Sequence, residues 1–223
     1  MVTGTLTKLL EETRQACEPK RNYIGSSEIG HPCWRNIWFN YHGEHKKPRD
    51  ARTNRILSIG KYLENYVLQL ISGIISVQVP IKDAKDKELP YFFGHPDAII
   101  RLENKLYVLE IKTANHASFQ QLVKHGLRKW NEQYYAQVQC YLGFLNMDSG
   151  FLLCLNKNTG QFHDEYVEFD HLYFEQLRIK AKAIHDATIP PPKINKSPLF
   201  WTCRMCAFKD KCHSDDNHQE YKP

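Results

Sequence analysis

Apolar residues recur at helical spacing in the first third of the chain. The pattern predicts an amphipathic helix over residues 3–17 and a loop over 23–30 that enters a second helix, capped by Ser26 or Ser27. The apolar face of that second helix should comprise Trp34, Ile37 and Trp38. A long helix over 53–72 should follow, with a stripe formed by Ile56, Ile59, Leu63, Val67 and Leu70.

The middle of the chain changes to a strand pattern. Residues 74–81, 91–100 and 106–113 are rich in β-branched and aromatic side chains, and residues 103–105 could form a hairpin turn. Pro190 to Pro192 should start an extended tail. The other predicted helices and strands lie at 116–126, 131–145, 151–155, 165–169 and 172–187. We therefore expect an α/β fold with a small mixed central sheet flanked by helices.

Length and charge refine this expectation. The 223 residues are enough for one domain, 1–223, or one domain with a small appendage, and the net charge of +5 permits a nucleic-acid partner. Within it we expect an N-terminal helical part over 1–52, a core over 53–188 and a cysteine segment over 189–223. The sequence lacks a secretory signal and any run of about 18 apolar residues, so we expect a soluble, cytoplasmic protein without a membrane partner.

Three charged residues interrupt two apolar strands in the middle of the chain. Asp97 lies in one predicted strand, and Glu110 and Lys112 share a face of the next. Charges in such a strand carry a desolvation cost, which binding to a metal ion and a phosphate would offset. Asp97, Glu110 and the backbone carbonyl of Ile111 could bind Mg²⁺ or Mn²⁺, while Lys112 could assist the attacking water.

These residues resemble a known nuclease core. Gly94-His-Pro-Asp97 followed by Glu110-Ile-Lys112 is similar to the PD-(D/E)XK nuclease superfamily, and Gln137-Val-Gln-Cys-Tyr141 resembles the QxxxY motif of its RecB-like exonuclease branch. In Gly60-Lys-Tyr-Leu-Glu64, Glu64 stands where that branch often has a metal-binding histidine. The resemblance implies a restriction-endonuclease-like core. It also implies active-site roles for Gln137 and Tyr141 and metal binding by Glu64.

Four of the seven cysteines form a pattern of their own. Cys203, Cys206 and Cys212 cluster near the C-terminus, and Cys33 is the best candidate for a fourth metal ligand. The pattern resembles the iron–sulfur subgroup that includes AddB-type helicase–nucleases and CRISPR-associated RecB-like nucleases. It implies a 4Fe–4S cluster that joins the chain ends. Zn²⁺ is the alternative, with His213 as a candidate fourth ligand in place of Cys33. The other cysteines, Cys17, Cys140 and Cys154, read as core residues.

A short basic run lies between two predicted helices. Lys124, Arg128 and Lys129 could hold a DNA backbone, with Trp130 stacking on a base, but the run could equally be a solvated helix end. Arg55, on the long helix, could reach a phosphate in the site or form a salt bridge.

The sequence thus predicts a metal-dependent DNA exonuclease acting on ends or single strands in recombination or repair, of the kind that viruses and mobile elements encode. A recombination protein is a further expected partner. One alternative is a CRISPR-associated nuclease that trims DNA before spacer integration. Others are a non-catalytic DNA-binding module stabilised by its metal cluster, and an RNA-processing enzyme. Oligomeric state is left open.

Overall fold

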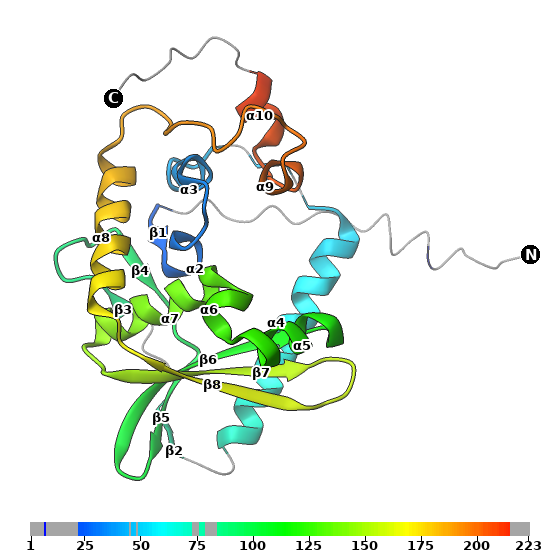
Figure 1. Cartoon of the computed structure of the whole chain (residues 1–223), viewed down its shortest axis with the longest axis vertical. Helices are drawn as coiled ribbons and strands as arrows, with labels where there is room; N and C mark the ends of the chain where they lie inside the picture. The colour runs from blue at the N-terminus through cyan, green and yellow to red at the C-terminus, as the bar shows by residue number, and fades with distance from the viewer. Residues whose placement is uncertain are drawn as a thin grey trace, which may run out of the picture.

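The larger of two sheets forms one end of the molecule (Figure 1). The computed structural model describes residue 7 and residues 22–44, 46–47, 49–72, 76–78 and 84–214. The sheet has the order β2-β5-β6-β7-β8, and its pairs are antiparallel except for the parallel pair β6–β7. The strands are β2 Ser76–Gln78, β5 Ala98–Leu102, β6 Lys105–Ala114, β7 Ser149–Asn156 and β8 Phe162–Glu168. The predicted small mixed sheet is confirmed.

A second, three-stranded sheet lies beside the first. Its order is β1-β4-β3, and its strands are β1 Ile24–Gly25, β3 Ala84–Lys85 and β4 Phe92–Gly94. The prediction of one strand over 91–100 is therefore wrong, because β4 and β5 belong to different sheets. Pro96 lies between them, and a proline has no N–H to donate to a ladder. Asp97 consequently stands just before β5 instead of inside a strand.

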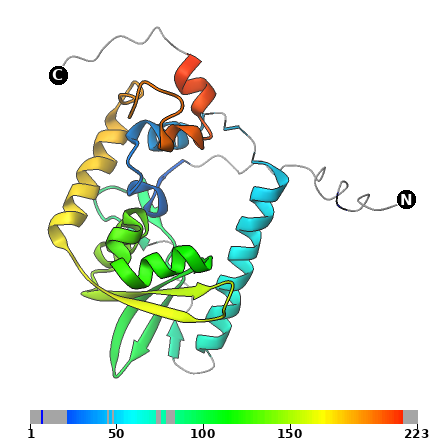
Figure 2. The ribbon, with the colours of Figure 1, turned by 45° about the vertical axis from the view of Figure 1, so that its right-hand side comes forward.

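The helices flank the two sheets, as predicted. Figures 1 and 2 show α4 and α8 on opposite sides of the molecule, with α3, α9 and α10 at the end away from the larger sheet. Asn115, Asn131 and Asp170 accept hydrogen bonds from the first turns of α5, α7 and α8. The helices are α2 Ser26–Ile29, α3 Trp34–Tyr41, α4 Ala51–Ser72, α5 His116–His125, α6 Leu127–Trp130, α7 Glu132–Leu145, α8 His171–Asp186, α9 Trp201–Arg204 and α10 Lys209–Ser214.

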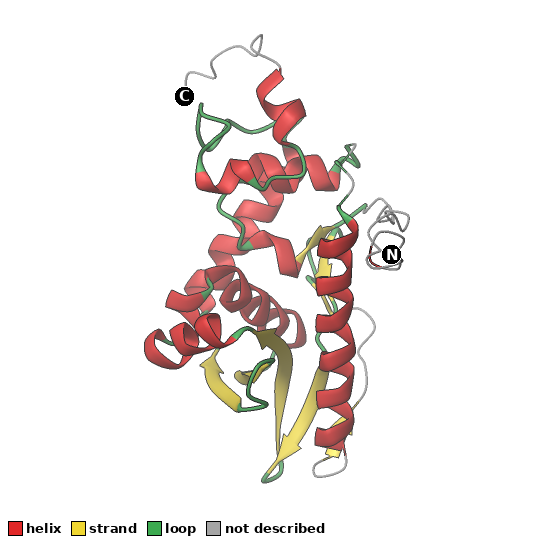
Figure 3. Cartoon of the chain, turned by 90° about the vertical axis from the view of Figure 1, so that its right-hand side faces the viewer, coloured by secondary structure: helices red, strands yellow, loops and turns green. Residues whose placement is uncertain are grey.

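Helix α7 is the centre of the main core. Its side chains are buried without interruption from Ala136 to Leu142, because α2, α8 and both sheets contact it. A helix that is apolar on most of its surface needs such an enclosure. The smaller core cluster lies on the other face of β6, where Leu109 and Ile111 pack against Val67 of α4. Figure 3 shows α4 running alongside the sheet.

Several predicted details of the helices are wrong. Ser26 and Ser27 cap nothing, because Ser26 is already inside α2, and Cys33 precedes α3 without a side-chain cap. Trp34 is 42% exposed, although Ile37 and Trp38 are buried as predicted. In α4 the residues that meet the core come from the second half of the helix, so Ile56 and Ile59 of the first half remain exposed. Leu70 is exposed as well, because Leu68 and Ile71 meet the core in its place.

The two ends of the chain also differ from the expectation. Helix α8 ends at Asp186, within one residue of its predicted end, but the tail after the prolines contains α9 and α10 instead of being extended throughout. The predicted helix over 3–17, Cys17 and most of the strand over 74–81 lie outside the described residues. The predicted hairpin turn is confirmed, since Glu103 and Asn104 both have positive φ between β5 and β6. The proposed subdivision at residues 52 and 188 stays a prediction.

Two glycines provide a test of this packing. A Cβ on Gly94 would lie 1.8 Å from Oγ of Ser26 and 2.8 Å from a ring carbon of Tyr141, whereas one on Gly60 would make ordinary contact, 3.6 Å from Thr113. We expect Gly94→Ala to lower the free energy of unfolding by about 1–3 kcal/mol. Gly60→Ala, inside α4, should raise it by about 0.5–1 kcal/mol. Urea unfolding measures both, and an unchanged Gly94→Ala stability would contradict the packing of α2 against β4.

Candidate active site and cysteine cavity

Strand β6 places Glu110 and Lys112 side by side. Both side chains lie on the face covered by α7, and the ammonium group of Lys112 contacts Oε1 of Glu110. Glu110 is 1% exposed, and its second oxygen, Oε2, is buried without a hydrogen-bond partner. A buried carboxylate oxygen in this condition is suited to bind a cation.

Asp97 is fixed to the same strand by a hydrogen bond. The backbone N–H of Ile111 donates to Oδ2 of Asp97 at 2.7 Å. The pairing of Ala98 with Leu109 brings the two segments into this register. The carboxylate therefore accepts a backbone hydrogen bond just before β5 begins. This contact holds Asp97 next to Glu110, although Asp97 lies outside a regular strand.

Glu64 approaches the group from α4. Burial raises the pKa of Glu64, and the charge of Asp97 raises it further, while Lys112 and Lys61 oppose the shift. Glu64 therefore lies within electrostatic range of Lys112 and Asp97. Its helix contacts β6 directly. The structure thus brings together the four charged side chains that the sequence singled out.

Burial dominates the electrostatics of this cluster. It raises the pKa of Glu110 to about 8, opposed by Lys112 and assisted by Asp97, and it also raises the pKa of Asp97. For Lys112, burial is outweighed by the carboxylates of Glu110, Asp97 and Glu64, so its pKa is raised and it stays charged. Three acids and one lysine leave an excess of negative charge, which a divalent cation would neutralise.

Gln137 and Tyr141 support the segment that carries Asp97. Nε2 of Gln137 donates to the hydroxyl of Tyr141 at 2.8 Å, and that hydroxyl donates to the carbonyl oxygen of His95 at 2.9 Å. Both side chains are buried. The one-turn spacing on α7 therefore positions the loop Gly94–Asp97 from behind.

Tyr134 is a site residue that the sequence reasoning missed. Nζ of Lys112 lies 5.1 Å from the centre of its ring, which is within the range of a cation–π contact. Burial raises the pKa of Tyr134, with Lys112 acting in the opposite direction. Tyr134 precedes Gln137 by three residues and Tyr141 by seven, so helical spacing from the QxxxY pattern could have identified it.

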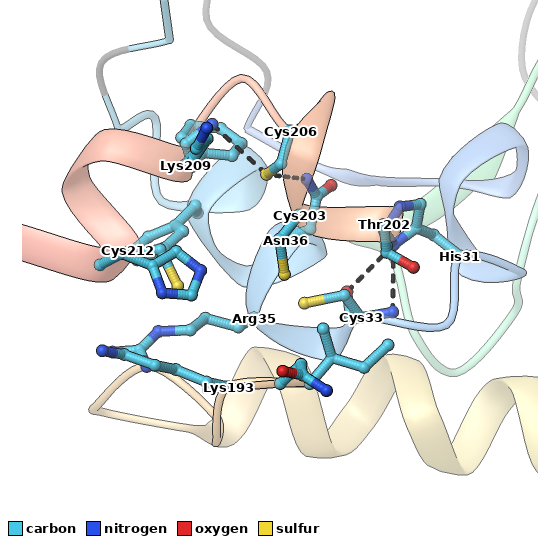
Figure 4. A pocket seen from close by; sticks show the side chains of 15 residues that line it. His31, Cys33, Arg35, Asn36, Lys193, Thr202, Cys203, Cys206, Lys209 and Cys212 are labelled. Atoms are coloured by element: carbon cyan, nitrogen blue, oxygen red, sulfur yellow. Dashed lines mark hydrogen bonds between the residues drawn. The ribbon is translucent and has the colours of Figure 1, made fainter. Parts of the chain in front are cut away.

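The four predicted metal-binding cysteines line one cavity. Cys33 precedes α3, Cys203 and Cys206 come from α9 and the turn after it, and Cys212 from α10. Figure 4 shows these side chains around one space. Burial raises the pKa of the Cys33, Cys203 and Cys212 thiols, and the other cysteines raise each of them further. Segments about 170 positions apart in sequence therefore meet here, as Asn36 donating to Sγ of Cys206 also shows.

The candidate metal ligands are not gathered closely at either the β6 site or the cysteine cavity. Among the described residues, no three His, Cys, Asp or Glu side chains are grouped closely enough to hold a metal ion as they stand. Cys140 and Cys154 are fully buried, as predicted for core residues.

The predicted DNA-contacting residues have mixed surroundings. Lys124 and Lys129 are exposed, whereas Arg128 lies over the rings of Tyr135 and Tyr173 at about 5 Å and 3.8 Å from Asp170. The indole N–H of Trp130 donates to Ser118 at 3.0 Å. Arg55 lies on the first half of α4 and is partly buried. Base stacking by Trp130 and phosphate binding by the four cations stay predictions.

Comparison with solved structures identifies the fold as restriction-endonuclease-like. The alkaline exonuclease LHK-Exo from Laribacter hongkongensis, solved alone and in complex with dAMP, superposes with a TM-score of 0.57. It is 14% identical over 74% of this chain and 87% of its own. SSO0001 gives a TM-score of 0.54 at 19% identity, over 95% of this chain and 96% of its own. No family model and no curated protein sequence matches the chain.

At these sequence identities the likeness to the solved structures shows the fold alone. The predicted fold class is confirmed, and the structural neighbours include an exonuclease. Within the described part of the chain, no helix combines the length and apolar character needed to cross a membrane.

The pKa of Glu110 predicts how stability depends on pH. Without divalent metal, the folded protein keeps the Glu110 proton up to about pH 8, whereas the unfolded chain releases it near the ordinary value of 4.5. The free energy of unfolding should therefore fall as pH rises between these values, by at most about 1.4 kcal/mol per pH unit from this group. Urea titrations in a chelator measure this slope. Glu110→Gln is the control, and an identical slope in the variant would contradict the assignment.

Proposed function

We propose that this protein is a metal-dependent deoxyribonuclease, and more narrowly an exonuclease that hydrolyses DNA at ends or in single strands. The convergence of Glu64, Asp97, Glu110 and Lys112 on β6 carries the proposal. Fold likeness to an alkaline exonuclease supports it. The ordered resemblance to PD-(D/E)XK nucleases of the RecB-like branch, including the QxxxY residues, supports it further.

The residues present fit a divalent cation such as Mg²⁺ or Mn²⁺. Glu64, Asp97 and Glu110 would hold it, together with the backbone carbonyl of Ile111, and the unpartnered Oε2 of Glu110 is a free acceptor for it. Such an ion polarises a phosphate and lowers the pKa of bound water. The protein's contribution is to exclude solvent from the carboxylates and to fix Asp97 through the N–H of Ile111.

Lys112 has a separate role in this mechanism. Its charge is held by three carboxylates and by the ring of Tyr134, so it remains a cation at neutral pH. A fixed ammonium group at this position can orient the attacking water or stabilise the charge that develops on phosphorus. Gln137 and Tyr141 act by keeping the loop of Asp97 in place.

DNA is the proposed partner of the surface around this site. Arg55, Lys124, Arg128 and Lys129 would contact the backbone, with Trp130 next to a base. Lys124 and Lys129 are the better placed of these, because their side chains are exposed, whereas Arg128 already lies over two tyrosine rings. We place the activity in recombination or repair, where a partner protein would act with it. Trimming of DNA before CRISPR spacer integration would use the same site.

Variants of the charged cluster test the enzyme. End-labelled linear, circular and single-stranded DNA would be incubated with Mg²⁺ or Mn²⁺ and the full-length protein. Asp97→Asn and Lys112→Met should each lower the cleavage rate by at least about 100-fold, because they remove a metal ligand and a fixed charge. Lys105→Met, exposed on the same strand, should cleave at the wild-type rate.

The substrates distinguish the finer alternatives. Cleavage of linear DNA with intact closed circles is the outcome expected of an exonuclease. Cleavage of closed circles would instead show that the protein is an endonuclease. DNA binding without cleavage in either metal would instead support the non-catalytic binding module, and cleavage of RNA alone the RNA-processing alternative.

We propose a second metal centre at the cysteine cavity, a 4Fe–4S cluster bound by Cys33, Cys203, Cys206 and Cys212. The cavity fits an absent group, because Nε2 of His213 and other buried polar atoms around it lack partners. Amide donors to Sγ of Cys206 suit a thiolate ligand. Zn²⁺ is the alternative, with His213 as a candidate fourth ligand. Either centre would stabilise the junction of the chain ends.

Metal analysis of anaerobically purified protein decides between these ions. We expect about four irons and four sulfides per chain, with a brown colour and absorbance at roughly 400 nm. Cys212→Ser should lose that colour, and Cys140→Ser, altering a core cysteine, should keep it. Colourless protein with one zinc would establish the alternative, and metal-free protein would contradict the centre.

A further inference from the structure

Unsatisfied polar atoms concentrate around the cysteine cavity. Among the described residues, six buried side-chain atoms have no hydrogen-bond partner, and three of them belong to residues that line this cavity. They are Nε of Arg35, Oγ1 of Thr202 and Nε2 of His213. Buried polar atoms are normally paired, so this concentration indicates a missing polar group at one place.

Arg35 is the least expected residue of the three. It is only 5% exposed, and no carboxylate of the described residues forms an ion pair with its guanidinium group. Glu44, which follows α3, pairs with Lys211, and Asp210 of α10 pairs with Lys47. The guanidinium lies instead over the ring of Phe39, 5.6 Å from its centre. A buried cation without an anion is strongly unfavourable.

The cysteine sulfurs are the groups in this cavity that would become anions on binding a metal. The charges of Arg35 and Lys193 act on the thiol of Cys212. In Figure 4, Arg35 extends along the side of the cavity where Cys212 lies. On another side, Nδ2 of Asn36 donates to Sγ of Cys206 at 3.2 Å, and the backbone N–H of Phe208 at 3.4 Å. Two cations therefore act on Cys212, and two N–H donors contact Cys206.

From this arrangement we infer that Arg35 is the counter-charge of an anionic thiolate–metal centre, with Asn36 as a hydrogen-bond donor to its sulfurs. The inference rests on the cysteine centre proposed above. A divalent ion or a 4Fe–4S core held by four thiolates carries net negative charge, which a buried guanidinium offsets. Arg35 is thus a positioning residue, which retains the metal and, for an iron–sulfur centre, raises its reduction potential.

Two substitutions of Arg35 separate the effect of its positive charge from the effect of its side-chain shape. Full-length protein purified anaerobically would be mixed with excess chelator, and the rate of metal loss measured. Arg35→Met should lose metal at least about tenfold faster than wild type, and Arg35→Lys should recover most of the difference because it restores the cation. Arg204→Met is the matched control, since Arg204 is exposed on α9 beside Cys203 and does not line the cavity.

Asn36→Asp gives a second, nearly isosteric test. It replaces the donor to Cys206 with a negative charge and leaves an acceptor for Asn40, which donates to Oδ1 of Asn36. Metal loss should again accelerate. This variant decides the question if Arg35→Met fails to fold, and loss at the wild-type rate would then overturn the inference.

A potential measurement separates charge from general loosening of the fold. For an iron–sulfur centre, Arg35→Met should lower the equilibrium constant for reduction about tenfold, which is about 59 mV for one electron. Metal loss and potential equal to those of Arg204→Met would overturn the role of Arg35 alone. A wild type without metal would overturn it together with the cysteine centre. Neither result affects the nuclease assay of Asp97→Asn.

Discussion

The burial of Glu110 is the constraint on which the rest of the active site depends. The Glu110 side chain is 1% exposed, and its burial raises its pKa to about 8, so its ionised form needs an opposite charge nearby. Lys112 supplies part of the match two residues along the same strand face. Asp97 and Glu64 then add more negative charge to the same place. A buried ion pair with surplus carboxylates is a poor device for stability but a suitable one for binding a cation.

The surrounding architecture follows from holding these groups together. Pro96 ends the pairing of one sheet before β5 begins the other, and the N–H of Ile111 donates a hydrogen bond to Asp97 just beyond the end of the β5–β6 ladder. Behind this junction, Tyr141 of α7 contacts the carbonyl of His95, and the absence of a side chain on Gly94 lets the ring approach. The central helix therefore does two things: it fills the main core and it fixes the position of one acid.

The two proposed metal centres of this chain differ in the chemistry of their ligands. The β6 site combines oxygen ligands with an excess of acids, which favours a hard divalent ion. Helices α3, α9 and α10 lie at the end of the molecule away from the larger sheet (Figure 1). There the four cysteines share a cavity with the cations Arg35 and Lys193, which favours an anionic thiolate centre. The second centre would join α3 to α9 and α10, elements that otherwise share few contacts with the sheet. The β6 site would thus carry out the hydrolysis of DNA, and the cysteine centre would stabilise the fold.

Local pattern in the sequence determined the elements with strong periodicity: the hairpin of β5 and β6, the central helix α7, and the alternation that puts Glu110 and Lys112 on one face. It also selected Asp97 and the four cysteines as chemistry-bearing residues, to which the resemblance to RecB-like nucleases added Glu64. Only the tertiary structure decided that 91–100 divides between two sheets and that α4 leaves Ile56 and Ile59 exposed. The same holds for Tyr134 beside Lys112 and for Arg35 without an acid partner. Periodicity records which side of an element is apolar, but what that side meets, and which charge lies opposite, depends on contacts between residues far apart in the chain.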